Sequence, residues 1–363
     1  DLDALHEMGV FPDLANHVIR FLFVTRDFEV GIVCNLPKYV DARNGTDDGN
    51  TTGSYDNPVR TITKALDLLG YQKGTINVNP GVYAPVVIEQ DVEIRIIAHG
   101  RVSECVIDGG GTNRCAQLGR ALGDVKAKIV GFTLRNGDAG DQHGGGVRFG
   151  QVERCRVIDC RTKGDGGGLY GVAARDTLVA LCSAGGQGNL ADKSTLRNCT
   201  LRDSSSAGWT LTTSGCRNCV VTSEGGATLL SGVDTFDHSV SNAVYACPGD
   251  RYSGYLAENS PGLAAGDVDV TLDGETDLDG KPRLTQGDYA ATVDCGCYEG
   301  VPVLCTVHGD IKGVNPWGTS DFTMVEGSDL ILPYGYSVIE LSVGGEPVPQ
   351  PPEPCATGRN TEP

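Results

Sequence analysis

The sequence has few of the residues that fill large helical cores, and it has no long apolar run. Only 2 of its 363 residues are Met and 2 are Trp, and aromatic residues make up 6%. VIRFLFV (residues 18–24), the most apolar stretch near the start, is far shorter than the ~20 residues that a membrane helix needs. We therefore expect short elements and no membrane span.

Basic residues are also scarce. The chain has 29 Lys and Arg against 47 Asp and Glu, a formal net charge of −18. Phosphate backbones and anionic membranes repel a chain this acidic, so we expect no nucleic-acid partner.

Glycine and cysteine, by contrast, are abundant. The 51 glycines are roughly twice the usual share, which is typical of turns and short strands. The 14 cysteines lack metal-site spacing: the single CxxC has no second pair in register, and no CxxCH motif for haem occurs. So many cysteines favour an oxidising, extracytoplasmic compartment.

An internal repeat runs through the middle of the chain. Six segments share the pattern apolar-x-x-(small or apolar)-x-apolar, and their fourth positions are 23, 27, 17, 20 and 24 residues apart. A period near 20 with insertions is typical of a solenoid. We expect one inward-facing column at these fourth positions: Phe132, Cys155, Cys182, Cys199, Cys219 and Ala243. Val157, Leu201 and Val221, two residues further on, should also face inward.

Two glycine runs support this interpretation. GGGVRFG (144–150) and GGGLYG (166–171) are near copies, with VERCRVIDC (152–160) between them. Short strands with Gly turns cannot bury an apolar face alone, but stacked coils share a continuous core. The glycines then mark the corners of each coil, and VERCRVIDC is the strand between corners. We expect about ten coils over residues 75–298.

Motifs at both ends of this region carry a resemblance. YVDARNGTDDG…NPVRTITKALDLL…PGVY (39–83) resembles the N-terminal cap of right-handed parallel β-helix proteins of the pectin-lyase-like superfamily. Ile62, Ala65, Leu66 and Leu69 fall on one helical face that can cover the first coil. DLDGKPRL (277–284) and DCGCYE (294–299) resemble the closing motif DxDGxPR…DxGxYE of bacterial surface β-helix proteins, and the middle coils resemble repeats of polymorphic membrane proteins.

The expected fold is therefore all-β: a parallel β-helix with a capping helix and a small C-terminal β module. We divide the chain into four parts: a segment of unassigned role and a candidate docking strand (1–37), the β-helix with its cap (38–300), a small β module (301–346) and a Pro-rich tail (347–363).

The four stacked cysteines of the repeat can be bridged or can be free buried thiols, and side chains in parallel register seldom aim at each other. Cys105 with Cys115, and Cys305 with Cys355, are the better candidates for disulfides, because each pair flanks a loop or the tail.

Catalytic motifs of fold-related galacturonases (NTD, GDD, GHG, RIK) are absent from the sequence. The best constellation for a lyase or hydrolase is a mixed-charge group that two adjacent coils would place on one side: Asp141, His143, Arg148, Arg154, Arg156, Arg161, Lys163 and Asp165. Ordinary solvation of an outward face explains the same pattern, and His143 also reads as a turn residue.

Calcium is the only cofactor for which the sequence offers candidate ligands. Asp273, Glu275, Asp277 and Asp279 alternate as calcium ligands do, although the closing motif and turn chemistry account for them equally.

Two function classes stay open. The first is an extracellular or bacterial cell-surface scaffold, adhesin-like and without catalysis, which associates with itself through residues 1–37 and 301–346 or with an envelope or glycan ligand. The second is a polysaccharide lyase, hydrolase or glycan-binding protein that uses one face of the coil.

Overall fold

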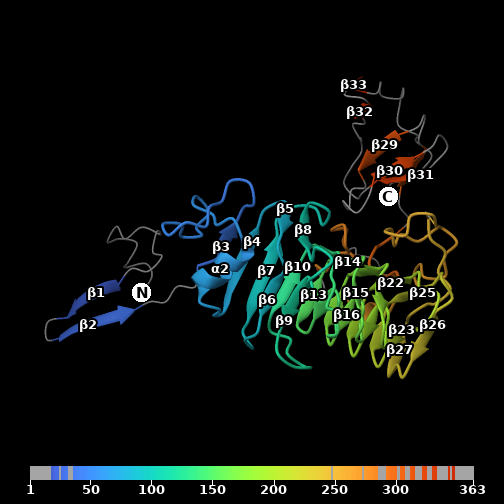
Figure 1. Ribbon diagram of the computed structural model, residues 1–363, viewed down its shortest axis with the longest axis horizontal. Helices are drawn as coiled ribbons and strands as arrows, with labels where there is room; N and C mark the ends of the chain where they lie inside the picture. The colour runs from blue at the N-terminus through green and yellow to red at the C-terminus, as the bar shows by residue number, and fades with distance from the viewer. Residues whose placement is uncertain are drawn as a thin grey trace.

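The chain folds into a right-handed parallel β-helix with its axis horizontal in Figure 1. The computed structural model describes residues 36–246, 248–271, 274–284 and 292–300, and of residues 1–35 and 301–363 only the strands named below. Three parallel sheets line the coil, and two of them have 7 strands each, which gives seven complete coils where the sequence suggested ten. The repeat gave too high a count because residues 240–300 leave the coil.

Sheet 1 contains β3 (Lys38–Val40), β4 (Gly74–Val78), β7 (Ile94–Ala98), β10 (Lys128–Val130), β13 (Gln151–Glu153), β17 (Ala173–Arg175), β21 (Thr195–Arg197), β24 (Gly215–Arg217) and β27 (Thr235–Asp237). Sheet 2 contains β5 (Gly81–Tyr83), β8 (Cys105–Asp108), β11 (Thr133–Arg135), β14 (Arg156–Ile158), β18 (Leu178–Ala180), β22 (Thr200–Asp203) and β25 (Val220–Ser223). Sheet 3 contains β6 (Val86–Ile88), β9 (Ala116–Leu118), β12 (Val147–Arg148), β16 (Leu169–Tyr170), β20 (Ala191–Asp192), β23 (Trp209–Thr212) and β26 (Thr228–Ser231).

The remaining strands pair outside these sheets. β15 (Arg161–Thr162) and β19 (Ser183–Ala184) form a small parallel sheet. The others form antiparallel pairs: β1 (Val18–Phe23) with β2 (Arg26–Gly31), β28 (Val303–Thr306) with β31 (Asp329–Leu332), β29 (Ile311–Val314) with β30 (Asp321–Met324), and β32 (Ser342–Val343) with β33 (Glu346–Pro347).

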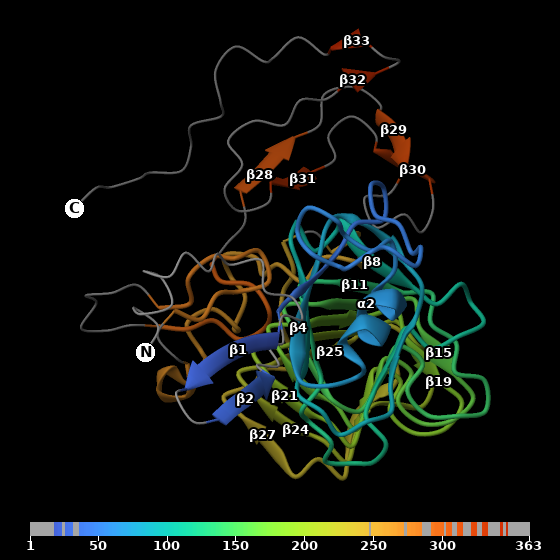
Figure 2. The same ribbon diagram turned by 90° about the vertical axis from the view of Figure 1, so that its left-hand side faces the viewer.

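A single α-helix, α2 (Ile62–Leu69), covers the N-terminal end of the coil (Figure 2). Its N-cap residue Thr61 accepts a hydrogen bond from the Lys64 amide at 3.1 Å, and Gly70 ends it in the left-handed conformation. The four residues predicted to face the coil (Ile62, Ala65, Leu66 and Leu69) are buried. No helix in the described part of the chain is both long and apolar enough to cross a membrane.

From β10 onward, each corner between sheets 1 and 2 contains one residue with positive φ. Along the coils this position is occupied by Gly131, Arg154, Asp176, Asn198, Asn218 and His238, with φ between 43° and 82°. VERCRVIDC is consequently two strands, β13 and β14, which bend at Arg154, and the single strand predicted from the sequence is wrong.

The repeated glycines lie at the corners that enter sheet 3. Gly144 and Gly166 have φ of 74° and 68°, so they provide the bend. Gly168 is needed for space: a Cβ atom there would lie 2.6 Å from the Leu190 carbonyl oxygen and 2.7 Å from Val179 Cγ1.

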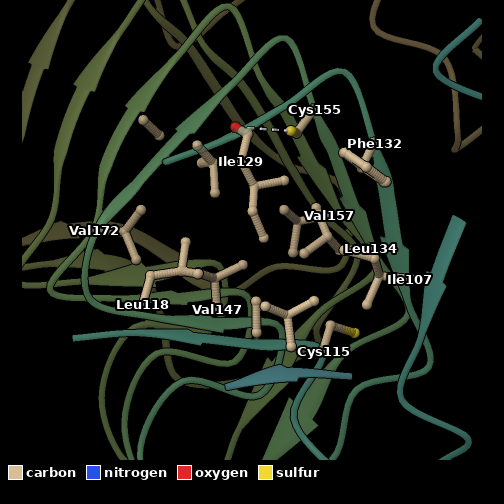
Figure 3. Close-up of a cluster of buried hydrophobic side chains, with 14 of the residues drawn as sticks. Ile107, Cys115, Leu118, Ile129, Phe132, Leu134, Val147, Cys155, Val157 and Val172 are labelled. Atoms are coloured by element: carbon tan, nitrogen blue, oxygen red, sulfur yellow. Dashed lines mark hydrogen bonds between the residues drawn. The ribbon is translucent and has the colours of Figure 1, made fainter. Parts of the chain in front are cut away.

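Apolar side chains from all three sheets fill the interior of the coil (Figure 3). Val157, Leu201 and Val221 are fully buried, as predicted. The column that contains Phe132 and Cys155, however, has a different register from the predicted one. Backbone hydrogen bonds between coils define the column. The residue after each member donates its amide to the carbonyl of the member one coil earlier, as the Arg156 amide does to the Phe132 carbonyl. The column therefore contains Phe132, Cys155, Thr177, Cys199, Cys219 and Ser239.

Cys182 and Ala243 therefore do not belong to this column, although Cys182 is buried. The corrected separations are 23, 22, 22, 20 and 20 residues, far more regular than the predicted ones. Cys182 lies after β18, at the place in its coil where Cys160 lies after β14. The column members come before these strands, so Cys182 is one strand further along the coil than the column. The error arose because a small polar residue, Thr177, fills the position expected to hold cysteine.

The ten described cysteines are all unbridged and buried. The predicted Cys105–Cys115 disulfide is wrong: the Cys115 thiol donates to the Arg135 carbonyl at 3.1 Å, and Cys105 Sγ lies 4.0 Å from the Val78 carbonyl oxygen. The side chains of Cys305 and Cys355 lie outside the described residues. Thiols in this part of the chain thus fill core volume as small apolar groups.

Residues after β27 turn back along the outer face of sheet 2 (orange in Figure 2). They bring Leu278, Cys297 and Tyr298 against Ile158 and Leu178, which forms a second apolar layer outside the coil. We call residues 274–284 and 292–300 the closing segment. One face of the solenoid is thereby covered, and sheets 1 and 3 present the outer faces considered below.

Candidate functional site

Cross-coil ion pairs join the loops that lead from sheet 2 to sheet 3. Arg161 Nε lies 2.8 Å from Asp138 Oδ2, Lys163 Nζ lies 3.0 Å from Asp141 Oδ1, and His143 Nδ1 lies 3.2 Å from Asp165 Oδ2. The structure thus brings together Asp141, His143, Lys163 and Asp165 from two adjacent coils. We call residues 138–146 and 161–168 the loop face.

The loop face contains no enclosed acid–base pair. The side chains of Lys163 and Asp141 are 78% and 86% exposed, so water solvates both. The amide of Asp165 donates to His143 Nδ1 at 2.9 Å, and the His143 ring stacks on Tyr170 with centroids 4.5 Å apart. His143 therefore holds the glycine turn of the next coil in place.

Three arginines of the predicted constellation lie elsewhere. Arg148 is in β12 on sheet 3. Arg154 is at a corner between sheets 1 and 2 and bonds Thr276 Oγ1 at 3.3 Å, and Arg156 is buried on sheet 2 and bonds the Tyr298 hydroxyl at 2.5 Å. The placement of Arg154 and Arg156 beside Lys163 is wrong, because a corner lies between β13 and β14.

A pocket of about 350 Å³ opens next to the loop face, where sheet 2 ends. Its lining includes Gly111, Asn136, Asp159 and Arg161. Asp159 Oδ2 is buried without a hydrogen-bond partner in the described residues, and burial raises the pKa of this carboxyl to about 6. This acid has a perturbed pKa, but its unpaired oxygen is closed off from the solvent.

A second depression, of about 320 Å³, lies on the outer face of sheet 1 and contains a charge ladder. Lys128 Nζ is 2.9 Å from Glu153 Oε2, and Arg175 Nη2 is 2.6 Å from Glu153 Oε1. Burial opposes ionisation of Glu153, but these two cations outweigh it and hold its pKa below the usual value. Arg175 and Arg197 also both contact Glu275 of the closing segment.

The described calcium candidates are engaged in closing the fold. Asp277 accepts three backbone amides, from Asp279, Lys281 and Glu299, at 2.7–3.0 Å. Glu275 binds the two arginines of sheet 1, and Asp279 accepts from the Tyr255 hydroxyl. Asp273 lies outside the described residues.

One other group has ligand atoms close enough to hold a metal ion. Among the described residues, the ligand atoms of Asp237, His238 and Asp267 lie within 4.8 Å of one another. Asp237 also binds Arg217 at 2.7 Å, and His238 occupies a positive-φ corner of the coil. These contacts give Asp237 and His238 a structural role in the solenoid.

Sequence reasoning missed Asp159, Asp176 and Arg114. Asp159 stands between the buried residues Ile158 and Cys160, and this signal could have marked it as a corner. Asp176 is at a corner between sheets 1 and 2, and the incorrect register of the predicted column hid it. Arg114 directly precedes Cys115. Alternation of side chains along the chain would have placed Cys115 inside the coil and Arg114 outside it.

Among known proteins, the chain is similar to several solved structures. No protein-family model matches the chain, and no curated protein matches it. Similar solved structures include ORF18 of Geobacillus virus E2 (10% identity, 56% of this chain and 51% of that one, TM-score 0.32). Others are the pectate lyase Pel9A (12% identity, 74% and 97%, TM-score 0.32) and a GH136 lacto-N-biosidase from Eubacterium ramulus (11% identity, 58% and 53%, TM-score 0.25). The chain spans about half the length of the viral protein.

Proposed function

We propose that this protein is a non-catalytic scaffold that acts at a cell surface or in the extracellular space by contact. One observation carries the proposal: the charged side chains of the loop face and of the depression on sheet 1 are already paired with one another. Lys163 pairs with Asp141 in open solvent, and Glu153 is held between Lys128 and Arg175. General acid–base catalysis needs a group that is free to take up a proton near a bound substrate.

The architecture suits a rigid scaffold. Stacked coils pair their backbones along the whole axis, and the cap helix and the closing segment protect one end and one face. The closing segment carries the DxDGxPR…DxGxYE motif, whose resemblance to bacterial surface proteins supports the cell-surface part of the proposal.

Contacts with neighbours are assigned to the two ends of the chain. Residues 1–37 and 301–346 contain strands that pair only within short antiparallel sheets, and exposed edges of such pairs accept further strands. We expect the complete protein to associate with itself or with an envelope partner through these segments.

The test combines an activity screen with light scattering. The complete chain is incubated with pectin, alginate and glycosaminoglycans, with and without calcium, and its mass is measured over a range of concentrations. We expect no turnover and a mass that rises with concentration. Turnover that disappears in Lys163→Ala or His143→Ala would overturn the proposal.

The depression on sheet 1 favours the second candidate, a glycan-active or glycan-binding protein. It contains the cations Lys128, Arg175 and Arg197, and the last two lie in register on neighbouring coils. Turnover that disappears in Arg197→Gln but persists in Lys163→Ala would move the function to this face.

A further inference from the structure

Two arginines lie next to each other on sheet 3 without an acidic partner. Arg114 precedes β9 and Arg148 ends β12, and these two strands pair in parallel with Arg148 opposite Gln117. The positive charge of each acts on the other: burial first, and then Arg148, lowers the pKa of Arg114 to about 10. Like charges placed this close destabilise the fold unless something neutralises them.

Neutral groups hold the Arg114 guanidinium. Nε donates to the Gly144 carbonyl at 2.7 Å, Nη1 to Gln117 Oε1 at 2.8 Å, and Nη2 to the His143 carbonyl at 2.7 Å and to Gln142 Oε1 at 3.2 Å. These contacts fix its position and orientation while leaving its charge uncompensated.

Arg148 is even less satisfied. Its Nε is buried without a partner, and no hydrogen bond or ion pair connects it to any described residue. Its guanidinium carbon lies 4.6 Å from the centroid of the Phe149 ring, which limits its movement. A buried guanidinium nitrogen without an acceptor costs the full desolvation of that group.

Most other arginines of the coil have a carboxylate partner. Six on the described sheets have one within 4.0 Å: Arg135, Arg161, Arg175, Arg197, Arg202 and Arg217. Arg154 and Arg156 bond neutral groups of the closing segment. In a chain with a net charge of −18, two adjacent cations that remain unpaired within the described residues need an acceptor from outside.

We propose that Arg114 and Arg148 form a binding site for a single oxyanion group, such as a carboxylate or sulfate on a sugar or a free inorganic anion. Two fixed guanidiniums match the paired oxygens of such a group. The net charge of −18 disfavours dense polyanions, so the ligand carries its charges singly. The site lies on sheet 3, and it extends the proposed scaffold function by giving it a ligand class.

The experiment titrates the complete chain with sulfate, phosphate and galacturonate by calorimetry, at constant ionic strength maintained with chloride. We expect saturable binding of at least one oxyanion. Arg148→Gln, which removes the charge and keeps a polar side chain, should weaken this binding about 10-fold or more. Arg161→Gln is the matched control, because it removes an arginine of the loop face that already pairs with Asp138.

The three titrated ligands distinguish the possible chemical origins of the oxyanion. Preference for galacturonate indicates a sugar carboxylate, and preference for sulfate or phosphate indicates an inorganic or ester oxyanion. The proposal is overturned if none of the three binds saturably, or if Arg148→Gln binds as the unmodified protein does. Since the readout is binding, its failure is distinct from the detection of turnover, which would overturn only the proposed function.

Discussion

The guanidinium of Arg283 bonds a carboxylate 107 residues earlier in the chain. Its Nε lies 2.6 Å from Asp176 Oδ1, and both side chains are almost completely buried. Arg283 Nη1 also lies 2.8 Å from Glu299, so this arginine of the closing motif joins two parts of the closing segment to a corner of the coil.

We predict that Arg283→Met lowers the free energy of unfolding by about 3–5 kcal/mol, because it removes the nearer cation from the buried Asp176 carboxylate and leaves only Arg175, whose Nε is 3.4 Å from Oδ2. Urea denaturation measures the change. Arg283→Met combined with Asp176→Asn should recover part of the loss. Arg101→Met, at an exposed arginine, is the control and should have little effect. An unchanged midpoint for Arg283→Met would contradict the role of the pair.

We predict that Leu66→Asp in the cap helix causes aggregation or unfolding. Leu66 is 1% exposed and covers the first coil, so a carboxylate there must either be buried or displace the helix. Thr63→Asp, on the exposed side of the same helix, should remain soluble and folded. Circular dichroism and size-exclusion chromatography distinguish the two, and a normal elution profile for Leu66→Asp would refute the assignment of α2 as a cap.

Replacing Gly168 by alanine should cost about 1–3 kcal/mol, because the new methyl group overlaps the Leu190 carbonyl and Val179 of the next coil. Gly249→Ala is the control, since a Cβ atom there meets nothing within 4 Å. Thermal unfolding compares the two variants. Equal melting temperatures would show that the coils can separate more easily than their spacing suggests.

The ten described cysteines should resist alkylation in the folded protein. Burial raises the pKa of the Cys155 and Cys105 thiols to about 11, so little reactive thiolate forms near neutral pH. We expect iodoacetamide to label these ten positions only after unfolding in denaturant, as followed by peptide mass mapping. Recovery of a peptide that links Cys105 to Cys115 under native conditions would be the opposite result.

We expect the Asp159 carboxyl to make the folded protein more stable at mildly acidic pH than at neutral pH. Its pKa of about 6 in the folded state exceeds the unfolded value near 3.8. The folded state therefore binds more protons between about pH 4 and 6, and the free energy of unfolding decreases as pH rises through this window.

Removing this ionisation should remove the pH dependence that it causes. We predict that Asp159→Asn is more stable than the unmodified protein by about 1–2 kcal/mol at pH 7, after allowance for solvent screening, and equally stable at pH 4. The free energy of unfolding, measured as a function of pH for both proteins, tests this prediction. Arg135, Cys160 and Tyr252 also influence the pKa of Asp159, and the substitution leaves them in place. Parallel profiles for the two proteins would contradict it.

The fold was predictable because the coil repeats its chemistry. Glycine corners, buried valines and the apolar face of the cap helix each leave a periodic trace in the sequence, and the three-sheet coil follows from them. The predicted register was wrong where the repeat is irregular. Thr177 and Cys199 occupy equivalent positions in the packed coil, but a search for a repeated cysteine does not recognise the threonine.

The candidate site was harder to predict, because charge pairing depends on which coils are neighbours. Lys163 and Asp141 were grouped correctly, since they occupy equivalent loops. Arg154 and Arg156 were placed wrongly, because Arg154 is itself the left-handed corner residue and Arg156 lies beyond this corner on sheet 2. Arg114 and Arg148 stand out only when the partners of every other arginine are known.

The attachment of the closing segment also determines where mechanical load enters the solenoid. Arg283, Glu275 and Tyr298 bind Asp176, Arg197 and Arg156, which belong to middle coils and not to the last one. A pull on the chain beyond residue 300 is therefore transmitted to the centre of the stack by buried ion pairs. The last coils are held by single hydrogen bonds instead, from the Gly296 amide to the Asn218 carbonyl and from the Cys295 thiol to the His238 carbonyl, so they carry less of this load.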